Sequence, residues 1–84
     1  APAKEFAQAQ LKQMGEVAVR ALLSATRSAE QDLRAAAAEL LGQLGQPHAL
    51  PTLKLLLRDA DVRVRASAEA AMKLIDSKQV TLKA

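Results

Sequence analysis

The chain has 84 residues, enough for one small domain, and no cysteine, which excludes disulfides, thiolate metal sites and a cysteine nucleophile. Half of the residues are apolar, but Phe6 is the only aromatic residue, so the core must be aliphatic. The formal charge of +3 is mild, and acids are interspersed with the bases, unlike in a dedicated nucleic-acid-binding domain. Alanine and leucine favour helices, and no apolar run could cross a membrane, so the composition predicts an all-α domain without membrane insertion.

Capping residues and glycines divide the chain into five predicted helices, near residues 3–14, 16–27, 32–44, 48–58 and 61–75. Gly15 and Gly45 each follow a helix and are expected to cap it, because glycine readily adopts the left-handed conformation found there. Asp32 and Asp61 are expected to cap N-terminal ends. Pro51 falls in a first helical turn, where its missing N–H removes no hydrogen bond.

The two ends of the chain carry weaker signals. Residues 76–78 predict a helix stop, which gives a single domain over residues 1–78 and a tail over residues 79–84. The first residues include neither an initiator methionine nor a hydrophobic signal region. We therefore expect a fragment of a larger or processed protein.

A repeat of about thirty residues organises the sequence. Leu-Arg-Ala-Ala-Ala at residues 33–37 returns as Val-Arg-Ala-Ser-Ala at residues 64–68, thirty-one positions later. One apolar helix face runs through both copies, as Leu33, Ala37, Leu40, Leu41 and Leu44, then as Val64, Ala68, Ala71, Met72 and Ile75. Residues 4–15 match residues 34–45 more weakly. The sequence therefore predicts two helical hairpins and the first half of a third.

Helical periodicity also predicts the core and the open ends. From the second helix of each hairpin, the expected core residues are Val19, Leu22, Leu23 and Thr26, then Leu50, Leu53, Leu56 and Leu57. Gly42, inside a helix, is expected to allow close approach of a neighbouring helix. Gln10 replaces the Leu40 of the next repeat, as in a capping helix. Met72 and Ile75 are expected to lie open unless the tail or self-association covers them.

Two turn segments carry a family resemblance. Residues 59–68 read Asp-Ala-Asp-Val-Arg-Val-Arg-Ala-Ser-Ala, and residues 44–53 read Leu-Gly-Gln-Pro-His-Ala-Leu-Pro-Thr-Leu. Both segments resemble HEAT repeats, in particular the short bacterial variety first described in phycobilin lyases. The resemblance implies an all-α fold, a right-handed α-solenoid of antiparallel helical hairpins with about five helices, or two and a half repeats.

The resemblance also implies a ladder of aspartate and arginine along the turns between repeats. Asp59 and Arg65 are expected to form its complete pair, whereas Ser28 stands where an aspartate would precede Arg34. A guanidinium at a turn can satisfy helix-terminal carbonyls and bridge to a carboxylate. A structural role is therefore predicted for Arg34, Asp59 and Arg65.

No group of residues predicts catalysis, a metal site or a cofactor. His48 is the only histidine, which excludes a two-histidine metal site, and its place at a helix start favours an exposed role. The serines stand in no nucleophile motif, and the glycines form no phosphate-binding loop. We therefore expect no enzymatic activity and no cofactor.

The polar face of the second helices is the candidate partner-binding surface, with Arg20, Ser24, Arg27, His48, Lys54, Leu55 and Arg58. Its basic residues around Leu55 favour an acidic protein partner, and predict a protein–protein interaction or scaffolding module. The alternatives are nucleic-acid binding through the same residues, which scattered acids and absent stacking aromatics weaken, and an accessory role in a lyase-type enzyme. An ordinary charged solvent face with one incidental leucine fits the same residues.

Overall fold

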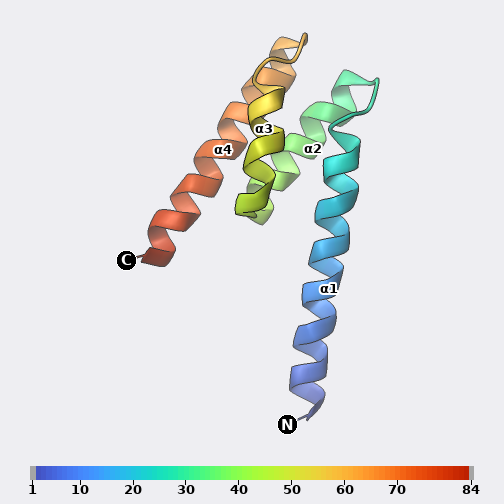
Figure 1. Ribbon diagram of the computed structural model, residues 1–84, viewed down its shortest axis with the longest axis vertical. Coiled ribbons are helices and arrows are strands. Elements are labelled where there is room, and N and C mark those ends of the chain that lie inside the picture. Colours follow the sequence, from blue (N-terminus) through green and yellow to red (C-terminus); the bar gives the residue numbers. More distant parts are fainter. Residues whose placement is uncertain (1, 84) are drawn as a thin grey trace.

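The computed structural model describes the backbone of residues 2–83 and the side chains of Gln10 and residues 13–78. Over this range the chain forms the helices α1 (Pro2–Ala25), α2 (Gln31–Leu44), the short 3-10 helix η1 (Pro47–Ala49), α3 (Leu50–Leu56) and α4 (Val62–Lys83). The most extensive packing joins α2 to α4, while α1 packs on α2 and α3 packs on α4 (Figure 1). The predicted all-α fold is confirmed.

A single continuous helix, α1, replaces the two helices predicted near residues 3–14 and 16–27, so the expected cap at Gly15 is wrong. At Gly45, where a cap does form, the backbone is left-handed with φ of 69°, and Pro47 soon starts a new helix. No proline follows Gly15 within α1. A glycine alone weakens a helix by only about 1 kcal/mol relative to alanine, which is too little to end it.

The turn after α2 forms as predicted. The Gly45 N–H donates to the carbonyls of Leu41 at 3.2 Å and of Gly42 at 3.1 Å, which closes the last helical turn. The fourth predicted helix is divided into η1 and α3, and Pro51 lies in the first turn of α3 as expected. The second repeat therefore has the hairpin that the first repeat lacks.

The two predicted N-caps have different outcomes. Asp61 caps α4: its Oδ1 accepts the backbone N–H of Arg63 at 2.8 Å and of Val64 at 3.2 Å. Asp32 does not cap α2, because the helix begins one residue earlier and Glu30 occupies the N-cap position without a side-chain hydrogen bond. Asp32 lies instead in the first turn, where its charge favours the positive end of the helix dipole.

The helix α4 runs past the predicted stop at residues 76–78 and continues to Lys83, so the stop and the tail predicted over residues 79–84 are wrong up to Lys83. No glycine or proline occurs between its first and last residues, and nothing in the local sequence breaks it. Ala84 lies outside the described residues.

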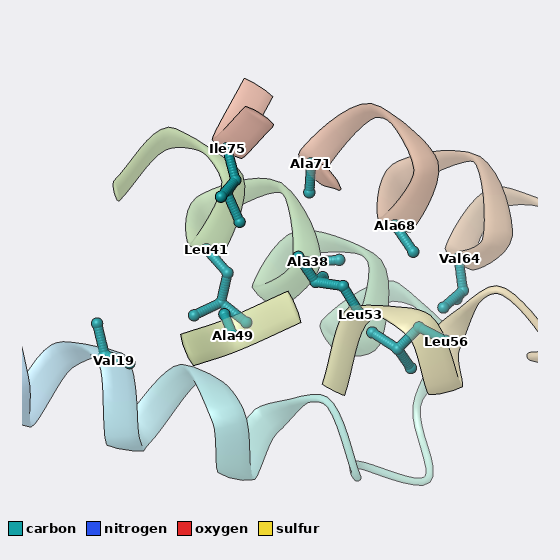
Figure 2. Close-up of a cluster of buried hydrophobic side chains, with 10 residues drawn as sticks. All are labelled: Val19, Ala38, Leu41, Ala49, Leu53, Leu56, Val64, Ala68, Ala71 and Ile75. Carbon is teal, nitrogen blue, oxygen red and sulfur yellow. The ribbon is translucent and has the colours of Figure 1, made fainter. Parts of the chain in front are cut away.

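The core lies between α2 and α4 and is closed by η1, α3 and α1 (Figure 2). Its buried cluster contains Val19, Ala38, Leu41, Ala49, Leu53, Leu56, Val64, Ala68, Ala71 and Ile75. A Cβ added at Gly42 would lie 2.6 Å from the Cα of Ala71, so the expected close helix approach at Gly42 is confirmed. Thr26 is buried as expected, and its hydroxyl donates to the Leu23 carbonyl at 2.6 Å.

Four leucines expected in the core are partly exposed, by 49% at Leu33, 45% at Leu40, 43% at Leu44 and 38% at Leu57. Leu57 lies just past α3, at the start of the turn to α4. The other three line a side of α2 that no described helix covers, because α1 does not fold back at Gly15.

The C-terminal helix is better covered than expected. Ile75, predicted to lie open, is fully buried, and Figure 2 shows it beside Leu41. Met72 is half-buried and packs against the same cluster. Leu33, Leu40 and Leu44 of α2 are therefore part of the uncovered apolar surface, whereas Ile75 is not.

Candidate protein-binding surface

Arg34 ties the turn before α2 to the turn before α4. Its guanidinium and the Asp59 carboxylate form a two-point ion pair, with Nε to Oδ1 at 2.8 Å and Nη2 to Oδ2 at 2.9 Å. Its Nη1 also donates to the carbonyls of Ser28 at 2.9 Å and Ala29 at 3.1 Å. Both side chains of the pair are largely buried, which makes this contact the main polar link between the repeats.

Arg65 repeats half of this arrangement one unit later. Its Nη1 donates to the backbone carbonyls of Asp59 at 2.6 Å and Ala60 at 3.2 Å, as Arg34 does at Ser28 and Ala29. The expected pairing of the Asp59 carboxylate with Arg65 is therefore wrong. The carboxylate reaches across to Arg34 of the preceding repeat, while Arg65 holds the backbone of its own turn.

Ser28 replaces an aspartate without loss of the turn. Its Oγ accepts the N–H of Glu30 at 3.1 Å, just as Oδ2 of Asp59 accepts the N–H of Asp61 at 2.9 Å. The hydroxyl reproduces the local bond, and at Ser28 Arg34 bonds the backbone carbonyl and not the side chain. The missing aspartate thus removes no contact on which Arg34 depends.

These bonds hold the turn carboxylates in their charged form. The hydrogen bond from Arg34, and then that from the Asp61 N–H, lower the pKa of Asp59, and the same ion pair raises the pKa of Arg34. At Asp61, burial alone would raise the pKa, but the N–H groups of Arg63 and Val64, together with the charge and the hydrogen bond of the Arg63 side chain, lower the pKa. In the turn before α4, both aspartate carboxylates are therefore charged and hydrogen-bonded, which favours a structural role.

The described cations divide into two groups. All those on α2 and α4 have a partner: Arg34 with Asp59, Arg63 with Asp32, Lys73 with Glu69, and Arg65 and Lys78 with backbone carbonyls. By contrast, no described acid or carbonyl pairs with the four exposed cations of the second helices and their turns, Arg20, Arg27, Lys54 and Arg58. Within the part of the chain that the structure describes, the charges of these four side chains therefore take no part in an ion pair or hydrogen bond.

All seven candidate binding residues are exposed. The structure divides them between two segments: Arg20, Ser24 and Arg27 on the C-terminal half of α1 and the turn after it, and His48, Lys54, Leu55 and Arg58 on η1, α3 and the turn that follows. Leu55 is 74% exposed, more than any other described large apolar side chain. We call these seven residues the ridge.

Sequence reasoning missed a second exposed surface, between α1 and α2. Met14 and Val17 on α1 are 66% and 56% exposed, and Leu40 and Leu44 of α2 are also uncovered. A signal was present in the sequence, since the residues after Gly15 lack the proline that follows Gly45. With Gly15 taken as a helix cap, the sequence predicts that residues 3–14 fold back and cover this surface, which they do not do.

The stacked helices, short turns and inter-repeat arginine define a helical-repeat scaffold. The family model for HEAT repeats matches residues 4–81, nearly the whole chain, and the chain belongs to the HEAT-repeat family. HEAT repeats are generally protein-interaction scaffolds, and the family is typically non-enzymatic. Among curated proteins, no sequence matches this chain. None of the described helices is long and apolar enough to cross a membrane.

Proposed function

We propose that this chain is a non-catalytic protein-interaction module that binds an acidic segment of a partner protein through the ridge. The single observation that carries the proposal is the division of the cations. The described cations of α2 and α4 have partners within the molecule, whereas no described acid or carbonyl pairs with the cations of the ridge. A free surface cation can pair with a partner without first losing an internal bond, and it steers an acidic partner toward the site.

Leu55 supplies the apolar contact that charges alone do not. It lies beside Lys54, and no acid occurs in the sequence from Gly45 to Arg58, so the segment that carries Leu55 is basic up to Asp59. Interfaces gain most of their affinity from a few desolvated apolar or arginine anchors, while rim charges mainly set specificity and association rate. An acidic segment with one apolar side chain fits this combination.

A peptide selection tests the proposal without knowledge of the partner. Peptides selected from a random displayed library against the wild-type chain should be enriched in aspartate and glutamate relative to the unselected library. Their dissociation constants should rise about tenfold or more with the double substitution Arg20→Glu and Lys54→Glu, and with Leu55→Asp. Higher salt should weaken wild-type binding.

The matched control reverses one arginine and one lysine on the first helices, Arg63→Glu with Lys73→Glu. Both residues are exposed, so the net charge changes equally while the ridge stays intact. The control should bind the selected peptides within about threefold of wild type. Peptides without acidic bias, or equal weakening by both double variants, would remove the ridge as the binding surface.

Two alternative functions require experiments of their own. Nucleic acid would meet the same free cations, but Phe6 is the only aromatic residue available for base stacking. A salt-sensitive shift in DNA or RNA mobility that is abolished by Arg20→Glu with Arg58→Glu would favour this alternative. The likeness to phycobilin-lyase-type repeats suggests an accessory role in a lyase-type enzyme, and turnover or a covalent adduct formed by the chain alone would support it.

A further inference from the structure

An apolar groove runs along α1 and the end of α2. It consists of two adjoining hollows of about 550 and 620 Å³ that meet at Ala18. The first is lined by Gln10, Gln13, Met14, Val17 and Ala18, and the second by Ala18, Ala21, Leu22, Leu40, Gln43 and Leu44. None of the described lining residues is charged, which sets the groove apart from the ridge.

The repeat shows what kind of element covers this groove. The repeat offset of thirty-one residues relates Leu33, Leu40 and Leu44 to Val64, Ala71 and Ile75. The exposed fractions of these three α4 residues are 0%, 1% and 0%, because α2 packs on them. The three leucines of α2 are 43–49% exposed at the equivalent positions. The same face is therefore covered in one repeat and bare in the other, and the missing cover is a first helix.

The chain contains a segment suited to this position. Residues 4–14 repeat the pattern of residues 34–44, and the family match begins at residue 4. Because α1 is continuous, however, this segment leads away from Leu40 and Leu44 of its own chain, and Figure 1 shows it extending past the other helices. The turn that would fold it back is also shorter by one residue than the turn after Gly45 and lacks its proline.

The apolar spacing along α1 indicates the partner. Ala7, Leu11, Met14, Ala18, Ala21 and Ala25 follow each other at alternating steps of four and three residues, without interruption at Gly15. This is the heptad spacing with which one helix packs along another. If the chain turned at Gly15, the apolar spacing before the glycine would not need to continue in register after it. A continuous helix that pairs along its whole length needs the same register on both sides of Gly15.

We infer that a second copy of this chain occupies the groove. The two α1 helices pack antiparallel about a twofold axis near Gly15, and the N-terminal half of each covers Leu40 and Leu44 of the other copy. Within the single chain, nothing lies within 4 Å of a Cβ added at Gly15, so no contact inside the chain requires a glycine there. In the pair, the missing side chain lets the two helices cross closely. No groove residue belongs to the ridge, which stays exposed in the pair.

Single cysteines test the geometry, since the natural chain has none. Met14→Cys lies near the proposed axis and should form a disulfide-linked dimer on mild oxidation. Leu55→Cys, which is at least as exposed but lies on the ridge, should form no disulfide-linked dimer under the same conditions. Equal cross-linking of the two variants, or none of Met14→Cys, would contradict the proposed pairing.

Sedimentation equilibrium tests the association itself. The wild-type chain should show a concentration-dependent dimer, and Leu40→Asp should raise its dissociation constant at least about tenfold, whereas Leu55→Asp should not. Ala18→Asp, an exposed change on α1, gives the same test if Leu40→Asp proves unfolded by circular dichroism. A wild-type chain that stays monomeric up to about 1 mM overturns the inference.

Discussion

At the scale of single residues, the two ion pairs that join the repeats differ in burial. The Arg34 and Asp59 side chains are 17% and 11% exposed, while Arg63 and Asp32 are 60% and 79% exposed. Exposed pairs contribute little to stability, because solvent screens them and ordering both side chains costs entropy. A desolvated two-point pair that also holds two carbonyls is expected to contribute far more.

Replacement of Arg34 therefore has a clear expected effect. Arg34→Ala removes the guanidinium that donates to the Asp59 carboxylate and to the carbonyls of Ser28 and Ala29, and should lower the thermal midpoint by about 5–10 °C. Arg63→Ala, which removes only the exposed pair, should lower it by less than about 3 °C. Differential scanning calorimetry compares the two, and equal shifts would contradict the role given to Arg34.

The lowered pKa of Asp59 makes this contribution depend on pH. The unfolded chain takes up a proton at Asp59 near the ordinary value of about 3.9, while the folded chain does so only at lower pH. The contribution is thus present above about pH 5 and is lost as the pH falls through the folded pKa. Thermal midpoints of wild type and Asp59→Asn should differ most at neutral pH and converge toward pH 2, whereas a constant difference would argue against it.

At the scale of elements, local chemistry explains what the sequence could predict. Gly45 and Asp61 act through their own backbone and nearest neighbours, so their caps could be predicted. Gly15 has the same residue type as Gly45 but no following proline, and a permissive residue does not enforce a turn. The partner of Asp59 lies 25 residues away on another element, and spacing within one turn could not reveal it.

The two helical glycines make opposite predictions for the same substitution. Gly15→Ala adds a side chain where nothing lies within 4 Å, and should stabilise the monomeric chain by up to about 1 kcal/mol. Gly42→Ala places a Cβ 2.6 Å from the Ala71 Cα, and should destabilise it by about 1–3 kcal/mol. Urea unfolding at low protein concentration measures both, and a stabilised Gly42→Ala would contradict the close packing of α2 on α4.

At the scale of the whole molecule, the first helices of the repeats, α2 and α4, differ in role from the second helices, which are the C-terminal half of α1 and the segment η1–α3. The first helices use their cations and small residues to hold the repeats together, as Arg34 and Gly42 do. The second helices bury one face and leave unpaired charge on the other. The periodicity of the sequence predicted which face of the second helices is polar, but which cations have a partner depends on contacts between repeats, as for Arg63 with Asp32.

The proposed function is that the free cations of the ridge bind an acidic partner. Amide chemical-shift mapping by NMR is the most direct test of this binding, with a glutamate-rich peptide that carries one leucine as the probe. The proposed function predicts salt-sensitive shifts confined to residues 20–27 and 48–58, with those near Leu55 among the largest. Shifts centred on the paired cations Arg63 and Lys73, or no shifts at low salt, would contradict it.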